Sequence, residues 1–529
     1  MTATPAPARA PIVDVPLRFN VAVEYIDGPV ANGHAQRTAI ICRDGSLTYA
    51  ELRRRVNRFA NAIRSLGIER EQRVAVLLPN RPEFVIAFYG ALKAGAVAAP
   101  VSFAVTASEQ LFLINDCGAR ALVTSETLWA PLRARRREMS MLKHVLLVDG
   151  CAGGETGEHD FDALLRDSPP DFEAAPTRRG DDAFWLHTSG STGTPKWAVH
   201  HHSHMPHCEQ LYGRPVIGLR PDDIVLSGSP CFHAYSLGVL TYFPFRAGAS
   251  VVLSPERTTA VHMFELIEKH RPTVFASVPT LYAQMLQAAE TEKPDLSSLR
   301  LCVSAAEALP AEIYRRFRQR FGVEVVDGMG STEALHTFIS NREGDVRPGS
   351  SGKPMPGYEV RLLDEKGAEV APGEAGSLWV KGGSLFAGYW HRPDVSRRVL
   401  RGGWFATGDT YVRDAEGFFW YQGRADDMLR VSGHWVSPPE VEAALMTHPA
   451  VLEAAVVGKR DADELSKPQA FVVLRDASAA SDELKEELKR HARASLALYS
   501  YPRWIEFVAE LPKTATGKIQ RFRLREAKA

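Results

Sequence analysis

The chain has 529 residues, which is too long for one hydrophobic core, so at least two domains are expected. Its 63 basic and 63 acidic residues cancel, which excludes an overall field that would draw it to nucleic acid or an acidic membrane. Six cysteines without C-x-x-C spacing are typical of reduced thiols in the cytoplasm. The most apolar run, residues 84–105, is interrupted by glycine, lysine and proline, which favours a helix and a buried strand over a membrane span.

Helical and strand patterns alternate along the first three quarters of the chain. Amphipathic helices are expected at 51–66 and 83–93, with apolar strands at 74–79 and 96–101. The same rhythm returns further on, with strands at 224–227, 250–253, 274–277 and 301–304 and a helix at 263–270. This alternation predicts an α/β fold of mostly parallel sheets covered by helices.

The pattern changes at Gly357. Glycine-punctuated strands at 359–363, 376–381 and 417–423 predict a small antiparallel, barrel-like subdomain. A compact α+β segment follows, with strands at 454–458 and 469–474 and a helix at 482–496. We therefore expect a large N-terminal domain at 1–425 and a smaller, mobile C-terminal domain at 426–529.

The most informative segment is the loop at 188–196, T-S-G-S-T-G-T-P-K. Glycines allow the backbone to approach an anion closely, hydroxyls supply donors and Lys196 adds charge, so the loop suits a polyphosphate. It is not the common nucleotide loop, which ends in Gly-Lys-Ser/Thr, because Pro195 precedes the lysine here and Trp197 follows it. Alone, such a loop is as often a solvated turn.

Three further motifs follow this loop in a fixed order. They are residues 330–333 (G-S-T-E), 407–409 (T-G-D) with 423–427 (G-R-A-D-D), and 512–518 (P-K-T-A-T-G-K). Together the motifs resemble the adenylate-forming superfamily of acyl- and aryl-CoA ligases, luciferases and adenylation domains, from about residue 47 to residue 518. Residues 327–333 and 431–438 are most similar to the benzoate–CoA ligase branch, which includes ligases for amino- and hydroxybenzoates.

The resemblance implies a site for ATP and Mg²⁺. The loop would hold the β- and γ-phosphates, Thr332 would contact the α-phosphate, and Glu333 would offer Mg²⁺ a hard carboxylate oxygen. A carboxylate and an arginine would grip the ribose hydroxyls. The residues that the resemblance assigns to the nucleotide are Thr188, Ser189, Gly190, Ser191, Thr192, Lys196, Ala306, Glu307, Asp327, Gly328, Met329, Asp409 and Arg424. Read alone, S-T-E predicts a helix N-cap, and a helix N-terminus is also an anion site.

The resemblance also implies a two-step reaction. The catalytic residue Lys518 would bridge the carboxylate and the α-phosphate as the acyl phosphate forms. Coenzyme A would then enter where Lys518 lay, after the C-terminal domain has turned about the hinge residue Asp426. Gly433 would line the path of the pantetheine arm.

The acid is expected to be aromatic and to bind near His233, which is either a gating catalytic residue or a packed core histidine. The other residues that the resemblance assigns to this pocket are Ala234, Tyr235, Gly330, His336 and Thr337. Benzoate-selective relatives tend to be aliphatic where Thr337 stands. Its hydroxyl could pair with a ring amino or hydroxy group, which favours 2-aminobenzoate, or a hydroxybenzoate, over benzoate.

Two residues depart from the family pattern, since relatives carry glycine where Trp197 and Ala306 stand. The indole must point away from the phosphates or reshape the loop entry, and the methyl group could crowd the adenine. The histidine-rich tract at 200–208 looks like a metal site but lacks carboxylates, so zinc is not expected.

The expected function is an ATP-dependent aryl-CoA ligase that forms aryl-AMP and then aryl-CoA, releasing AMP and pyrophosphate. Two alternatives remain open, a stand-alone adenylation protein that loads a carrier-protein thiol and a non-catalytic acyl-adenylate binder. A downstream carrier or acyl-transferring partner and a homodimer are also left open.

Overall fold

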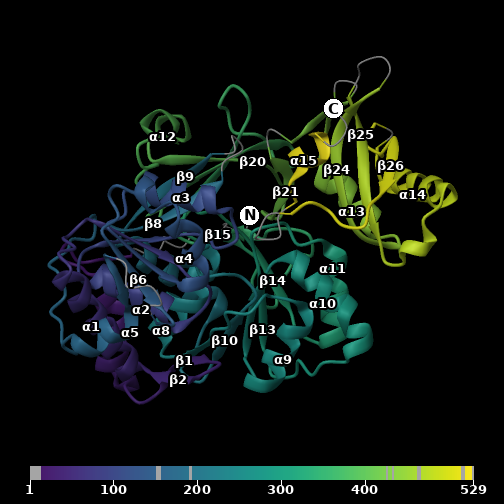
Figure 1. The fold of residues 1–529 in the computed structure, drawn as a ribbon. Helices are drawn as coiled ribbons and strands as arrows, with labels where there is room; N and C mark the ends of the chain where they lie inside the picture. The colour runs from purple at the N-terminus through teal and green to yellow at the C-terminus, as the bar shows by residue number, and fades with distance from the viewer. Residues whose placement is uncertain are drawn as a thin grey trace, which may run out of the picture.

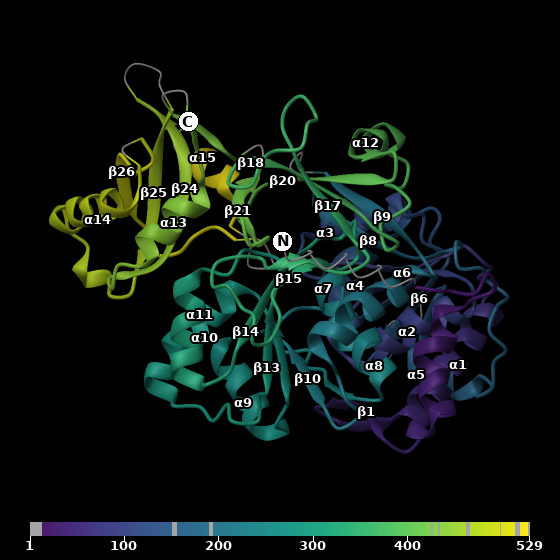
Figure 2. The same cartoon turned by 180° about the vertical axis from the view of Figure 1, so that it is seen from behind.

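The structure is a computed structural model that describes residues 13–150, 156–189, 194–424, 427–431, 434–461, 466–497, 499–513 and 519–526. Most of the described chain forms one large body with two helix-covered sheets, and the C-terminal elements project from it (Figures 1 and 2). No helix in these ranges is long and apolar enough to span a membrane.

The first large sheet has seven strands, in the order β7-β6-β5-β3-β4-β8-β9. All neighbours are parallel except β8 and β9, which form an antiparallel hairpin. The strands are β3 (Arg73–Leu77), β4 (Val97–Pro100), β5 (Ala121–Ser125), β6 (His144–Val148), β7 (Glu158–Asp160), β8 (Asp182–Ser189) and β9 (Pro195–His201). Their helices are α1 (Tyr49–Ser65), α2 (Pro82–Lys93), α3 (Ala107–Asp116), α4 (Glu126–Arg133) and α5 (Phe161–Asp167), with a short 3₁₀ turn, η3 (Arg136–Glu138).

Helix α1 shows why these segments fold as predicted. Thr48 and Glu51 form a capping box, which satisfies backbone N–H groups that the first turn would otherwise leave unpaired. Apolar side chains at helical spacing, among them Leu52, Val56 and Phe59, are fully buried. The helix therefore begins at its cap and packs its apolar face into the core.

The second large sheet has nine strands, in the order β16-β15-β14-β13-β12-β10-β11-β1-β2. Neighbours from β14 to β1 are parallel, whereas β15, β16 and β2 pair antiparallel at the edges. The strands are β1 (Thr38–Cys42), β2 (Gly45–Thr48), β10 (Ile224–Ser227), β11 (Ser250–Val252), β12 (Val274–Ser277), β13 (Leu301–Ser304), β14 (Val325–Gly330), β15 (Thr337–Ser340) and β16 (Lys353–Pro354). Its helices are α9 (Ala260–His270), α10 (Pro279–Glu292) and α11 (Ala311–Phe321).

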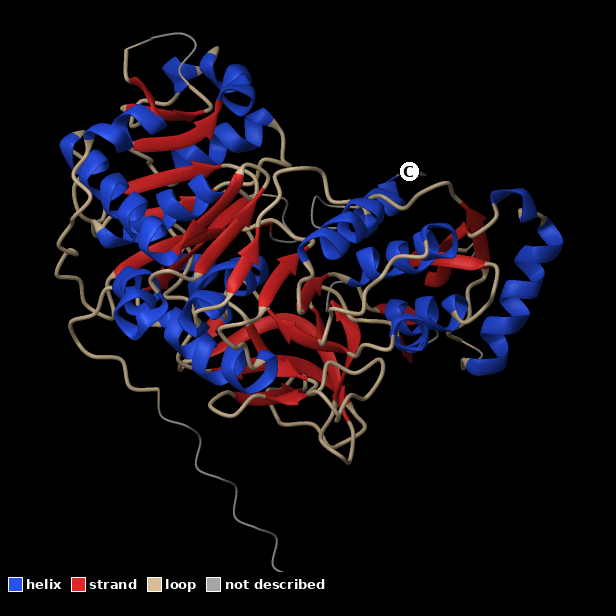
Figure 3. Ribbon diagram, turned by 90° about the horizontal axis from the view of Figure 1, so that it is seen from below, coloured by secondary structure: helices blue, strands red, loops and turns tan. Residues whose placement is uncertain are grey.

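Short helical pieces surround the second sheet and connect it to the first. They are η1 (Val23–Asp27), η2 (Val30–His34), α6 (His204–Cys208), η4 (Glu209–Ile217), α7 (Ala234–Leu237), η5 (Gly238–Tyr242) and α8 (Phe243–Ala247). The largest core cluster draws residues from both sheets and from these pieces. Seen from below, helices cover the strands of both sheets (Figure 3).

A five-stranded antiparallel sheet follows, as the glycine-punctuated pattern predicts. Strand β20 (Trp404–Arg413) pairs with β18 (Ala375–Lys381), β19 (Leu400–Arg401) and β21 (Phe419–Arg424), and β18 pairs with β17 (Glu359–Leu363). Helix α12 (Pro393–Val399) precedes β19.

The C-terminal elements have core clusters of their own. Strands β24 (Val451–Arg460), β25 (Ser466–Leu474) and β26 (Trp504–Phe507) form one sheet, and β22 (Leu429–Val431) pairs with β23 (His434–Val436). The helices are α13 (Pro438–Met446), α14 (Asp482–Ser495) and α15 (Arg521–Glu526), with the turn η6 (Ala477–Ala479). The α/β fold class is confirmed, and the domain boundary at 425–426 stays a prediction.

Candidate active site

One group of the predicted site residues lies where parallel strands of the nine-stranded sheet end. Ala306 and Glu307 come just after β13, Gly330 closes β14, and His233 follows the loop after β10. The carboxyl ends of parallel strands meet at one edge of a sheet, where ligands of α/β folds usually bind. The topology therefore brings together residues that lie up to about a hundred positions apart in sequence.

The segment with Ser331, Thr332 and Glu333 is a turn, so the predicted helix N-cap is wrong. Ser331 Oγ does accept the Ala334 N–H at 3.1 Å, as a cap would. However, Leu335 adopts a positive φ of 65°, and the chain reverses into β15, which pairs antiparallel with β14. The hairpin overrides the local helix signal, so no helix dipole acts at this turn.

Glu333 is held by a residue that sequence reasoning missed. The Tyr389 hydroxyl donates to Glu333 Oε1 at 2.6 Å, and the Phe386 N–H donates to the Glu333 carbonyl at 2.7 Å. Burial and the neighbouring carboxylate raise the pKa of Tyr389, so its hydroxyl stays a donor. The Lys196 ammonium lies 5.1 Å from the centre of the Tyr389 ring. One tyrosine thus touches both the expected Mg²⁺ ligand and the lysine of the phosphate loop.

The predicted phosphate loop, residues 188–196, joins strands β8 and β9 of an antiparallel hairpin. Thr188 is paired with Lys196, and Ser189 with Pro195. Predicted contacts Gly190, Ser191 and Thr192 lie outside the described residues. Trp197 is fully buried, and its indole meets the His187 ring edge-on at 5.6 Å. The indole therefore points into the core. This is the first of the two orientations expected for Trp197, in which the indole points away from the phosphates.

The predicted ribose residues are neighbours on β20 and β21. Arg424 Nη1 lies 3.2 Å from Asp409 Oδ1 and donates to the Thr407 carbonyl at 3.0 Å. Gly408 has a φ of 77°, a backbone conformation that favours glycine, and a Cβ there would lie 2.8 Å from Arg424 Nη2, so the arginine would have to shift. The arrangement can present a carboxylate and a guanidinium to a diol.

The predicted adenine segment holds a buried acid and a strained alanine. Burial raises the pKa of Asp327 to about 8, and the Leu309 N–H lies 3.4 Å from its Oδ2. Ala306 is exposed and has a φ of 76°, which costs a non-glycine residue about 1–2 kcal/mol. Glu307 accepts a hydrogen bond from Thr280 at 3.3 Å. Gly328 and Met329 lie on β14 beside them.

The predicted acid pocket centres on His336, which is 2% exposed. Burial lowers the pKa of His336 to about 3, so the ring is neutral near pH 7. Its Nδ1 lies 3.1 Å from Thr337 Oγ1, and its Nε2 lies 3.1 Å from the carbonyl oxygen of Tyr235. The aromatic rings around it are Tyr212 at 5.0 Å, Tyr235 at 5.5 Å and Phe243 at 4.8 Å.

The rest of the predicted pocket lies close to this histidine. A Cβ on Gly330 would come within 2.6 Å of the His336 carbonyl oxygen, so only glycine fits there. Ala234 is buried at the start of α7, directly after His233, whose ring lies 4.2 Å from that of Phe232. The fold thus brings five predicted pocket residues together, namely Ala234, Tyr235, Gly330, His336 and Thr337.

The predicted catalytic lysine Lys518, hinge Asp426 and CoA-path residue Gly433 lie outside the described residues. The chain on either side of residues 514–518 is anchored. Lys513 pairs with Glu453 at 2.7 Å, and Arg521 pairs with Glu442 at 2.8 Å.

The histidines of the tract at 200–208 lie mostly in the core. Among the described residues no group of three or more histidine, cysteine, aspartate or glutamate side chains could hold a metal ion. His200, His202 and His204 are buried instead, and burial lowers the pKa of each.

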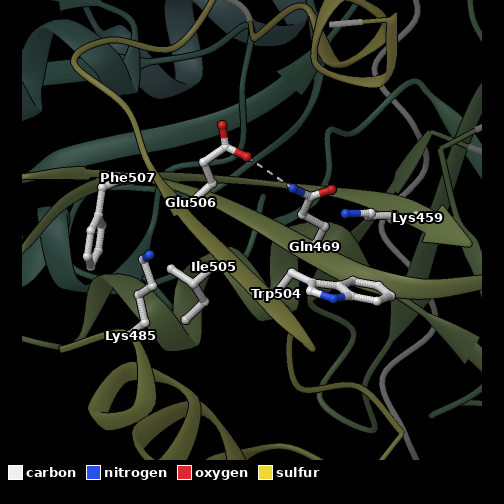
Figure 4. A pocket seen from close by; sticks show the side chains of 7 residues that line it. All are labelled: Lys459, Gln469, Lys485, Trp504, Ile505, Glu506 and Phe507. Carbon is white, nitrogen blue, oxygen red and sulfur yellow. Dashed lines mark hydrogen bonds between the residues drawn. The ribbon is translucent and has the colours of Figure 1, made fainter. Parts of the chain in front are cut away.

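A hollow of about 400 Å³ lies away from these residues, on the C-terminal sheet (Figure 4). The Lys459 ammonium lies 4.9 Å from the Trp504 ring, and Gln469 Nε2 donates to Glu506 Oε2 at 3.4 Å. The lysine side chains that line the hollow contact its aromatic rings, and none of the predicted site residues lines it. The lining side chains are Lys459, Gln469, Lys485, Trp504, Ile505, Glu506 and Phe507.

The fold and these motifs define an AMP-binding enzyme. The family model for AMP-binding enzymes matches residues 29–390, and that for the C-terminal domain of AMP-binding enzymes matches residues 440–518. The chain belongs to this family, which confirms the resemblance seen in its sequence.

Relatives place the chain more narrowly, in the benzoate–CoA ligase branch. It is 46% identical to a benzoate–CoA ligase of Thauera aromatica, over 98% of each chain. Its structure is similar to that of the anthranilate CoA ligase AuaEII in complex with anthranoyl-AMP, with a TM-score of 0.94, 40% identity and 97% and 98% of the two chains covered. A benzoate CoA ligase from Burkholderia xenovorans LB400 gives a TM-score of 0.89 and 41% identity, with 96% and 100% covered.

Proposed function

We propose that the chain is an ATP-dependent ligase that joins an aromatic carboxylic acid to coenzyme A through an aryl-AMP intermediate. The observation that carries the proposal is the β14–β15 hairpin. Its turn contains Thr332 and Glu333. Its second strand begins with Thr337, directly after the buried His336. The residues proposed to contact the nucleotide and those proposed to surround the aromatic ring would thus lie on one hairpin, which supports the joining of an aryl carboxylate to a phosphate.

The residues of the turn fit a magnesium nucleotide. Mg²⁺ prefers hard oxygen ligands and is usually bound by one or two carboxylates together with substrate phosphates. Glu333 supplies such a carboxylate, oriented by Tyr389 at 2.6 Å. When bound, the ion would neutralise phosphate charge as the acid attacks. Thr332 would hold the α-phosphate, and Lys196 the β- and γ-phosphates.

The remaining roles follow the sequence motifs. Asp409 and Arg424 would bind the ribose, and Lys518 would bridge the two anions during adenylation. A rotation of residues 426–529 about Asp426 would then admit coenzyme A past Gly433. Acid, ATP and coenzyme A are the three substrates, and AMP and pyrophosphate leave.

The hydrogen bonds of His336 indicate which acid fits. The Tyr235 carbonyl oxygen can only accept, so His336 Nε2 carries the proton of the neutral ring. Nδ1 is then an acceptor, and the Thr337 hydroxyl must donate its proton to it. With its proton directed to Nδ1, the Thr337 hydroxyl oxygen keeps lone pairs that can accept. Thr337 can therefore accept from a ring amino or hydroxy group but cannot donate to a substituent that only accepts.

We therefore propose 2-aminobenzoate, or a hydroxybenzoate, as the substrate. The test measures CoA-thioester formation from benzoate, 2-aminobenzoate, the hydroxybenzoates and 2-methoxybenzoate, whose oxygen cannot donate. Donor-bearing acids should give the highest kcat/KM, and 2-methoxybenzoate the lowest. Acid-dependent ATP–pyrophosphate exchange without thioester would indicate a protein that loads a carrier thiol, and no exchange would indicate a non-catalytic binder.

A further inference from the structure

One histidine of the tract at 200–208 contacts the backbone of the turn that contains Thr332 and Glu333. His200 is fully buried at the end of β9, and its Nε2 lies 2.8 Å from the backbone oxygen of Thr332, 132 residues further along the chain. The ring stacks on Phe184 of β8, with centroids 5.2 Å apart and planes at 13°. This hydrogen bond connects the seven-stranded sheet to the hairpin turn of the nine-stranded sheet.

The alternation of β9 explains why this residue faces the turn. Successive side chains of a strand point to opposite faces, so Lys196, Ala198 and His200 share one face. Trp197 and Val199 occupy the other face, in a separate core cluster. The lysine that would bind phosphate and the histidine that binds Thr332 are thus on the same side of one strand.

The Thr332 carbonyl fixes the protonation of His200. The Thr332 oxygen can only accept, so Nε2 of His200 carries the proton, and burial lowers the pKa of His200 to about 3, which keeps the ring neutral. Its Nδ1 must then accept, and His204 Nδ1 lies 3.0 Å away. The backbone N–H of His201 donates to the same His204 nitrogen at 3.3 Å. The proton that matters for the turn is the one on Nε2 of His200, which is donated to Thr332.

Thr332 is held by two different donors. The Leu335 N–H also donates to its oxygen, at 3.1 Å, but this bond lies within the turn itself. Of these two bonds, the one from His200 relates the turn to the strand that carries Lys196.

We propose that His200 is a positioning residue for adenylation, which holds the Thr332–Glu333 turn in register with Lys196 through its buried Nε2–H. This inference rests on the proposed function, in which the turn and the lysine contact one nucleotide. A displacement of about 1 Å between such groups can lower a rate about 100-fold.

The test compares three substitutions that separate the hydrogen bond from the bulk of the ring. His200→Gln keeps an N–H at about the position of Nε2, His200→Asn is one carbon too short, and His200→Phe keeps the ring on Phe184 without any N–H. We expect kcat for acid-dependent ATP–pyrophosphate exchange to fall about 10- to 100-fold in the Asn and Phe variants. The KM for the acid should stay within about twofold, and His200→Gln should recover most of the rate.

His201→Phe is the matched control, because it replaces the next histidine of the same strand, whose ring lies 3.6 Å from Asp182. It should keep the wild-type exchange rate. Equal losses in the Gln and Phe variants, or a Phe variant with the wild-type rate, would overturn the positioning role. If the Phe variant does not fold, the Gln and Asn pair decides. A wild-type protein without exchange would count against the proposed function instead.

Discussion

The hydroxyl of Tyr389 offers the most direct test of the proposed magnesium site at Glu333. Tyr389→Phe removes the donor that lies 2.6 Å from Glu333 Oε1 and keeps the ring over which Lys196 lies. A hydrogen bond to a charged group contributes about 1.5–3 kcal/mol, and loss of a residue that orients a metal ligand weakens metal binding about 10- to 100-fold. The freed oxygen could instead bind the ion better, but a carboxylate without its orienting donor samples more rotamers. We expect orientation to dominate.

The assay is ATP–pyrophosphate exchange measured against free Mg²⁺ at saturating ATP and acid. Half-saturation should shift to about 10- to 100-fold higher Mg²⁺, with a smaller change in the maximal rate. Tyr89→Phe is the control, because it removes a fully buried hydroxyl that donates to Thr241 at 3.1 Å in the core. A half-saturation concentration equal to or below that of the wild type would refute the role of Tyr389.

Three further predictions concern the pocket, the catalytic lysine and pH. Thr337→Val should lower kcat/KM for 2-aminobenzoate by about 1–2 kcal/mol and leave benzoate unaffected, and parallel losses on both acids would place Thr337 outside the pocket. Lys518→Ala should cost adenylation about 3–5 kcal/mol and spare thiolysis of supplied aryl-AMP; equal damage to both steps would contradict domain alternation. Burial lowers the pKa of four histidines to about 3 or 4, namely His187, His200, His202 and His336. In the unfolded chain these side chains take up protons near pH 6.5, so the free energy of unfolding decreases as the pH falls below that value. Asp327, with its pKa raised to about 8, acts in the opposite direction, so denaturant titrations should show a net loss of stability, of the order of a few kcal/mol, between about pH 6 and 4. A profile that is flat or rises as the pH falls would contradict the neutral state of these histidines.

The parallel sheets could be predicted because their strands are continuous apolar runs between turn residues. Strands β10, β12 and β13 begin and end where the sequence predicts. The β8–β9 hairpin could not be recognised, since its strands mix tryptophan, histidine and threonine with few aliphatic residues. The S-T-E pattern predicts a helix N-cap after β14, and this prediction is wrong for a related reason. Pairing between β14 and β15 overrides the local capping signal.

The site residues divide in the same way, into those that a local sequence motif marks and those that only a contact with a distant residue identifies. Glu333, Asp409 and Arg424 could be proposed from their motifs, since each lies in a short pattern with its own chemistry. Tyr389 and His200 could not, because each acts through a partner 56 or 132 residues away in the sequence. No charge or glycine pattern marks either residue, so only the fold reveals them.

The alternation of β9 also bears on whether Trp197 damages the site. Glycine is the usual residue here, and an indole could have entered the phosphate loop. Instead Trp197 pairs with His187 across the hairpin and packs with Trp185 and Val199 in a core cluster, while Lys196 points to the opposite face. A large side chain at this position therefore fills the sheet interior without displacing the lysine. Trp197 therefore gives no support to the non-catalytic alternative, because Lys196 stays on the opposite face of the strand.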